Sequence, residues 1–110
     1  MEVSKKAENG AQVVAVNGRV DAVTAPELEI ELNGCIDGGA NTIVIDLSAL
    51  EYISSAGLRV ILAIAKKLKT SGGDILLTGL GGAVKEVFEI SGFYSIFKVF
   101  DSAEEALKQV

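Results

Sequence analysis

The apolar positions between residues 43 and 70 change their spacing once. Ile43, Val44 and Ile45 form an unbroken β-branched run, which is typical of a strand covered on both faces. From Ser54 onward the spacing becomes helical, and one face carries Leu58, Ile61, Leu62, Ala65 and Leu68. The pattern predicts a buried strand, a short acidic connection and a helix that opens on Ser54 and Ser55.

The N-terminal part of the chain predicts a hairpin. Glu2 to Ala7 alternate weakly, Asn9-Gly10 favours a tight turn, and residues 12 to 16 form an apolar strand. Asn17-Gly18 predicts a second turn, directly after this strand. The chain is therefore expected to open with two antiparallel strands.

Two Ser/Thr-x-x-Glu patterns predict helix starts. Thr24 with Glu27 precedes a stripe made by Leu28, Leu32, Cys35 and Ile36, which ends at Gly38-Gly39. Ser102 with Glu105 opens a terminal helix that turns Ala103, Ala106, Leu107 and Val110 inward. The position of Cys35 on an apolar stripe indicates a core residue rather than a reactive thiol.

The segment from residue 74 to residue 100 predicts two more strands, at Ile75 to Leu77 and at Ile96 to Phe100. Between the two strands lies a helix with Val84, Val87 and Phe88 on its apolar side, which ends near Gly92. Alternating helices and strands imply parallel pairing through right-handed crossovers. We expect a single α/β domain over residues 1–110, with a mixed, mostly parallel sheet, an N-terminal antiparallel hairpin strand and about four helices.

Composition narrows the function classes. The 110 residues carry a net charge of −5, and the sequence contains no basic patch of the kind that binds nucleic acid directly. No apolar run is long enough for membrane insertion. The single cysteine and the lack of a basic-then-apolar leader predict a cytoplasmic location. With no histidine and a single cysteine, a Ser-His-Asp triad and the usual zinc sites are absent, so we expect neither that catalytic chemistry nor a metal site.

Ser54 and Ser55 stand where a helix N-terminus favours an anion such as phosphate. The sequence leaves open which of the two serines caps the helix. Serine is a preferred capping residue, so the pair also has a purely structural explanation. Gly57, a poor helix former three positions after Ser54, suggests that something approaches the helix closely there.

Two stretches of the chain resemble a known family. Residues 46–48 and 52–62 (DLS and YISSAGLRVIL) look like the signature of STAS domains of the bacterial anti-sigma factor antagonists. Residues 18–28 (GRVDAVTAPEL) are similar to that family's second motif, and the resemblance extends from about Val13 to the C-terminus.

The resemblance implies a phosphorylation switch. An unphosphorylated antagonist of this kind binds an anti-sigma factor that is itself a serine kinase, and so releases the sigma factor. ATP and Mg²⁺ belong to that kinase, so the resemblance implies that this chain is not an enzyme and needs no cofactor of its own. The kinase phosphorylates the serine corresponding to Ser55, and a PP2C-type phosphatase reverses the reaction. Many members regulated this way carry an acidic residue where this chain has Ser54 and a small polar residue where it has Ala56, so Ser54 remains the second choice.

A partner-binding rim is expected around this serine. Asp21 and Asp46 follow apolar strands, and the carboxyl ends of parallel strands converge on one edge of a sheet. Asp46 is expected to hydrogen-bond the turn at Ser54 and Ser55 or to orient the hydroxyl in the partner kinase. By resemblance the rim also includes Thr24, Ser54, Ala56, Gly57 and Arg59.

Two alternatives remain open. The first keeps the STAS fold without the phosphorylation switch: a constitutive subunit of a transporter or signalling complex that uses the same rim for contact. Gly79-Leu80-Gly81-Gly82, between a strand and a helix, with Asp101 about twenty residues later, has the placement of a dinucleotide-binding turn. Val84 stands where the last glycine of that motif belongs, which disfavours a nucleotide-binding protein.

Overall fold

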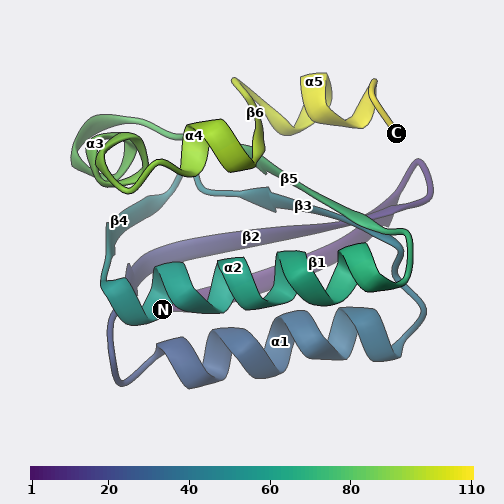
Figure 1. Cartoon of the computed structure of the whole chain (residues 1–110), viewed down its shortest axis with the longest axis horizontal. Helices are drawn as coiled ribbons and strands as arrows, with labels where there is room; N and C mark the ends of the chain where they lie inside the picture. Colours follow the sequence, from purple (N-terminus) through teal and green to yellow (C-terminus); the bar gives the residue numbers. More distant parts are fainter.

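The computed structural model describes all residues 1–110 and shows one mixed sheet with helices on both faces (Figure 1). The strands are β1 (Glu2–Glu8), β2 (Ala11–Val20), β3 (Thr42–Asp46), β4 (Leu50–Ile53), β5 (Asp74–Thr78) and β6 (Lys98–Phe100). The helices are α1 (Ala25–Asp37), α2 (Ser55–Thr70), α3 (Gly82–Ile90), α4 (Phe93–Ile96) and α5 (Ala103–Leu107). None of these helices combines the length and the apolar character needed to cross a bilayer.

The sheet order is β1-β2-β3-β5-β6, with β4 paired to β2 off this path. Only the β1–β2 pair is antiparallel; all other pairs are parallel. The expected α/β domain with an antiparallel hairpin strand at one side is confirmed, although it has five helices rather than about four.

The hairpin forms where it was predicted, but the second turn does not. Asn9 and Gly10 have φ of 51° and 80°, the left-handed conformations of a type I′ turn. Asn17-Gly18 was predicted as a turn, and this is wrong, because β2 continues through both residues to Val20. Gly18 (φ 86°) instead lies at a register shift within the β2–β4 pair, which begins after the β2–β3 pair has ended at Ala15.

Strand β4 lies within the segment that the sequence suggested was a connection. Leu50 and Ile53 are buried at its ends, while Glu51 and Tyr52 between them are exposed. This burial pattern has no period of two, so it gives no strand signal in the sequence. The strand exists because it pairs in parallel with the last residues of β2, from Gly18 to Val20.

The predicted strand at Ile96 to Phe100 is shorter, because a one-turn helix precedes it. Phe93 and Phe97 are both buried one turn apart, and the Phe97 amide donates to the Phe93 carbonyl at 2.8 Å. The Phe93 ring meets Phe88 of α3 edge-on, with centroids 5.4 Å apart. Burial of these rings favours α4, and the strand begins only at Lys98.

The two Ser/Thr-x-x-Glu patterns, which predicted side-chain caps at the starts of helices, differ in outcome. The Ser102 hydroxyl accepts from the Glu105 amide at 3.2 Å, as expected for the start of α5. Thr24 precedes α1, but its side chain caps no amide of that helix, so this part of the prediction is wrong. Its hydroxyl accepts instead from the Asp21 amide at 2.9 Å, because Asp21 organises the preceding turn.

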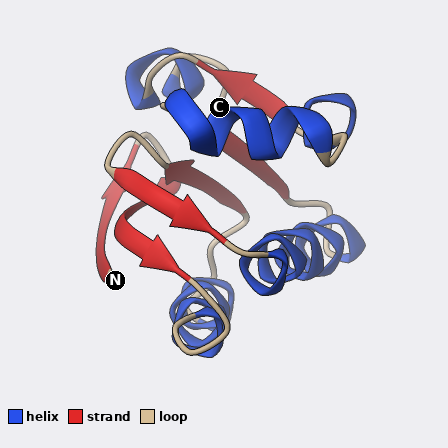
Figure 2. Cartoon of the chain, turned by 90° about the vertical axis from the view of Figure 1, so that its left-hand side faces the viewer, coloured by secondary structure: helices blue, strands red, loops and turns tan.

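Helices α1 and α2 cover one face of the sheet and α5 covers the other (Figures 1 and 2). The larger core fills the first face and includes Leu32, Ile61 and Leu77. The smaller core lies under α5, where Val44 and Leu76 meet Leu107. Cys35 is buried in the larger core, as its stripe predicted, and burial raises the pKa of its thiol.

Gly57 sets the distance between the first turn of α2 and the sheet. It is buried, and a Cβ atom placed there would lie 2.7 Å from both Val20 Cγ1 of β2 and Ile53 Cγ1 of β4. The close approach that the sequence suggested at Gly57 is therefore made by the protein's own strands. Without a side chain at this position, the start of α2 rests directly on the tips of β2 and β4.

Replacing Gly57 with alanine is expected to destabilise the fold by about 1–3 kcal/mol, because the added methyl overpacks this contact. Gly34→Ala in α1 is the matched control, since a Cβ there meets nothing within 4 Å and alanine favours the helix by up to about 1 kcal/mol. Urea unfolding of both variants measures the difference. Equal effects of the two substitutions would contradict this role for Gly57.

Candidate functional site

Helix α2 begins at Ser55, and Ser54 is its N-cap. Ser54 has extended backbone angles (φ −91°, ψ 172°), and its hydroxyl accepts from the Gly57 amide at 3.4 Å. Its own amide donates to the Val20 carbonyl at 2.8 Å, which ties the cap to the end of β2. The structure therefore decides the question that the sequence left open.

Ser55 is the exposed serine of the pair. It is the first residue of α2, and its hydroxyl makes no hydrogen bond within the protein. The first turn contains no acidic residue, so no side chain of this turn offsets the positive end of the helix dipole. Arg59 is also exposed and lies four residues later, on the same side of the helix as Ser55. An anion at Ser55 would meet free amide groups and one guanidinium.

The loop before α1 is held rigid by Asp21. One carboxylate oxygen of Asp21 accepts from the amides of Val23 and Thr24, both at 3.0 Å. The Thr24 amide, followed by that of Val23, lowers the pKa of the Asp21 carboxyl below its ordinary value. The loop carries a fixed negative charge and holds Val23 outward, with 80% of its surface exposed.

A shallow groove of about 330 Å³ connects this loop to the start of α2. Ala22, Pro26 and Glu29 line one side, and Ala56 and Arg59 line the other. We call the loop 21–24 and residues 54–59 together the serine rim. Figure 2 faces this part of the molecule, where α1 and α2 are seen from their ends.

Most of the predicted site residues lie in the serine rim, but Gly57 is not at its surface. Asp21, Thr24, Ser54 and Ala56 are partly buried, and Arg59 is exposed. Gly57 is buried against β2 and β4, so its place in the structure is one of packing rather than contact with another molecule.

Asp46 does not belong to the rim. The expectation that it hydrogen-bonds the turn at Ser54 and Ser55 is wrong: its carboxylate accepts from the Ser48 amide at 3.0 Å. Asp46 pairs with Ala15 of β2, and β2 continues to Val20, about 17 Å further along the sheet at strand spacing. The two carboxylates do not converge because β2 is longer than its sequence pattern indicated.

Arg19 and Tyr52 form a contact near the rim that the sequence did not reveal. They face each other across the β2–β4 pair, with the Arg19 guanidinium carbon 4.3 Å from the centre of the Tyr52 ring. Both residues are exposed. The sequence could have revealed this contact only if it had indicated that β4 pairs with β2, and no local pattern did so.

The glycines after β5 have a structural explanation. Gly79 has φ of 75°, and a Cβ there would lie 2.8 Å from the Ser48 backbone nitrogen. Gly82, at the start of α3, also has a positive φ of 56°. Of the residues that suggested a dinucleotide-binding turn, Gly79 thus packs against the loop after β3, Gly82 supplies a positive φ, and residues 79–84 line none of the cavities.

Comparison with known proteins agrees with this fold and signature. The model of the STAS domain family matches residues 2–106, and the chain belongs to this family. It is 44% identical over 106 residues to the Bordetella bronchiseptica protein named "Putative anti-sigma factor antagonist BtrV", covering 96% of this chain and 91% of that one. It is 28% identical to the anti-sigma-F factor antagonist RsfB of Mycobacterium tuberculosis, covering 93% and 83% of the two chains.

A solved structure shows the same arrangement. The crystal structure of an anti-sigma factor antagonist from Mycobacterium paratuberculosis superposes with a TM-score of 0.91 at 29% identity, covering 99% of this chain and 92% of that chain. The structural match thus spans the sheet, the serine rim and the C-terminal helix.

The Asp21 loop gives a pH-dependent prediction. Because the folded protein lowers the pKa of Asp21, the ionised carboxylate stabilises the fold above the unfolded pKa, and this stabilisation is lost as pH falls through the folded pKa. The difference in unfolding free energy between wild type and Asp21→Asn is therefore expected to be largest near neutral pH and to shrink in acid. Urea unfolding over a pH series measures it, and a constant difference would contradict this role.

Proposed function

We propose that this protein is an anti-sigma factor antagonist that is switched by phosphorylation of Ser55. Unphosphorylated, it binds an anti-sigma factor serine kinase through the serine rim and so frees a sigma factor. The names of its relatives support the antagonist role, at 44% and 28% identity over most of the chain. The protein acts as a regulatory binding module in the cytoplasm, and ATP and Mg²⁺ belong to the kinase.

The observation that carries the proposal is that the two serines have different roles in the structure. Ser54 is engaged as the N-cap of α2 and Ser55 is exposed with a free hydroxyl, so a kinase can reach Ser55 without breaking the cap. A kinase that acts on Ser54 would first have to draw its hydroxyl away from the Gly57 amide that it caps. This geometry favours Ser55 over Ser54 as the acceptor.

The fold can tolerate the charge that a complex cannot. A phosphate adds about −1.5 to −2 charges at neutral pH. At Ser55 it lies at the positive end of the α2 dipole, one turn from Arg59, so the free protein accommodates it. In a docked complex the same phosphate is desolvated at a surface that already carries the Glu29 carboxylate in the groove and the ionised Asp21 in the neighbouring loop. The modification therefore acts on binding and leaves the fold intact, and a PP2C-type phosphatase restores the active form.

Incubation with ATP, Mg²⁺ and the anti-sigma factor kinase is expected to add one phosphate, read by intact mass and peptide mapping. Ser55→Ala is expected to abolish the gain. Ser54→Ala is the matched control: it loses a cap worth about 1 kcal/mol but keeps the acceptor. Phosphate on Ser54, or none on either serine, would contradict the switch.

If Ser55 is not modified and Ser55→Asp leaves partner affinity unchanged, the rim serves a constitutive STAS subunit of a transporter or signalling complex instead. Ser54 and Ala56 depart from the pattern of the regulated members and are the reason for testing this second function. Partner affinity, measured by calorimetry for Ser55→Asp and wild type, therefore distinguishes the two functions.

Val23 provides a test of the rim itself. Its side chain is 80% exposed at the centre of the loop, so Val23→Asp is expected to leave the unfolding free energy within about 0.5 kcal/mol of wild type. If the rim docks on the partner, burying a new carboxylate is expected to weaken binding at least about tenfold. Ile30→Asp is the control, since Ile30 is 70% exposed but faces the β1 side of α1, beside Met1 and Val3. Equal losses from both variants would contradict docking through the rim.

A further inference from the structure

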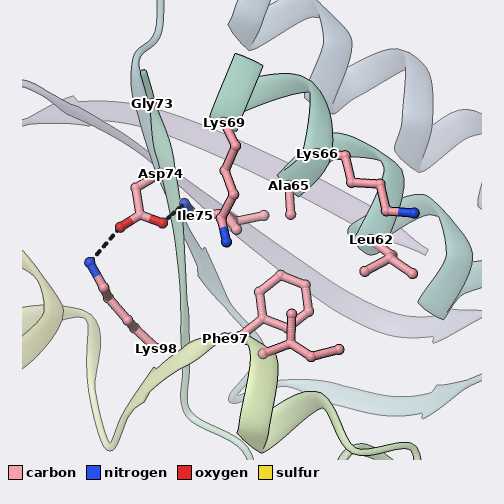
Figure 3. Close-up of a pocket in the computed structure, with 10 residues that line it drawn as sticks. Leu62, Ala65, Lys66, Lys69, Gly73, Asp74, Ile75, Phe97 and Lys98 are labelled. Atoms are coloured by element: carbon pink, nitrogen blue, oxygen red, sulfur yellow. Dashed lines mark hydrogen bonds and ion pairs between the residues drawn. The ribbon is translucent and has the colours of Figure 1, made fainter. Parts of the chain in front are cut away.

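The largest cavity lies at the end of α2 that is remote from Ser55 (Figure 3). It has a volume of about 410 Å³ and opens between α2, β5 and the chain that enters β6. Lys66 and Lys69 follow Ser55 by eleven and fourteen residues, which places them about 16–21 Å along the helix. This cavity is therefore separate from the serine rim.

The floor of the cavity is apolar. Ile75 of β5 and Phe97 are part of the main core and are 2% and 8% exposed, so only their edges reach the cavity. Leu62 and Ala65 of α2 form one wall, and Ile96, which is 52% exposed, forms the opposite one. The cavity persists because α4 ends at Ile96 and no further helix fills the space beside α2.

The edge of the cavity is cationic. Lys66 and Lys69 come from the last turns of α2, and Lys98 comes from β6. Asp74 is the one carboxylate in the lining, and it is already occupied: one oxygen contacts Lys98 Nζ at 2.6 Å and the other accepts from the Ile75 amide at 2.9 Å. Lys66 and Lys69 have no ion-pair partner, and in Figure 3 Lys69 extends toward the Phe97 ring.

The cavity lining is positively charged, whereas the protein as a whole is negatively charged. The lining has three cations and one anion, in a chain with a net charge of −5. Lysines near a helix C-terminus complement the helix dipole, which explains Lys66 and Lys69 as residues of α2. The dipole does not explain why they border an open apolar floor that Lys98 completes from another element.

We propose that this cavity binds a small amphipathic organic anion. Its volume falls in the range of small-molecule sites, which combine an apolar lining with a few placed polar groups. The aliphatic or aromatic part of the ligand contacts Ile75, Phe97 and Leu62, and its carboxylate or phosphate pairs with Lys69, which extends over the floor in Figure 3, with Lys66 adding positive charge at the α2 edge. This assignment does not depend on the function proposed for the serine rim.

Decanoate and decyl phosphate are the probes, each below its micelle-forming concentration, with decanol as the uncharged comparison. Saturable one-to-one binding is expected by calorimetry, with amide shifts in ¹H–¹⁵N spectra concentrated at Leu62, Ile75 and Phe97. Decanol is expected to bind about tenfold more weakly, because it lacks the charge that the two lysines pair with. The relative affinities of decanoate and decyl phosphate distinguish a carboxylate from a phosphate ligand.

The double variant Lys66→Gln/Lys69→Gln is expected to reduce decanoate affinity about tenfold. Lys85→Gln/Lys108→Gln is the matched control, since it removes the same charge at two exposed lysines outside the cavity and is expected to change affinity less than twofold. Both double variants leave the apolar core intact, and their unfolding free energies are compared with wild type.

Three results would overturn the proposal. These are an absence of saturable binding by both anionic probes, shifts that map outside the cavity, and equal losses of affinity in the two double variants. None of them bears on the phosphorylation of Ser55, so this site and the switch can fail independently.

Discussion

The contact of α2 with the tips of β2 and β4 determines the geometry of the serine rim. Gly57 lies within van der Waals reach of Val20 and Ile53, and only a residue without a side chain fits there. The amide of Ser54 is held by the Val20 carbonyl, so this serine becomes the cap and Ser55 the first exposed residue. Were the helix to start elsewhere, the roles of the two serines would change.

Helix α2 links two chemically different surfaces. Its N-terminus presents free amide groups, Ser55 and Arg59 beside the fixed charge of Asp21. Its C-terminus presents Lys66 and Lys69 above an apolar floor. The largest cavity is therefore not at the surface proposed to bind a protein partner, as expected if that partner docks on a shallow rim and a small molecule fills a deeper cavity.

The sequence predicted the elements whose residues carry strong local patterns. The run Ile43 to Ile45 and the helical stripe from Leu58 to Leu68 are both present, as is the Asn9-Gly10 turn. These features depend on backbone preference and on which face is apolar, and both can be read from neighbouring residues. The STAS signature around Ser54 and Ser55 was likewise local, which is why the family could be identified from the sequence.

Only the tertiary structure decided the features that depend on distant pairing. The extension of β2 to Val20 and the existence of β4 arise from their mutual pairing, and neither segment shows the pattern of a strand. That pairing separates Asp46 from Asp21, brings Arg19 onto Tyr52 and makes Ser54 the cap. The cavity beside Phe97 also joins residues from α2, β5 and β6. Sequence patterns determined which faces of the elements are apolar and, to within a residue or two, where the helices lie, whereas long-range packing determined which serine caps α2 and which polar side chains share a surface.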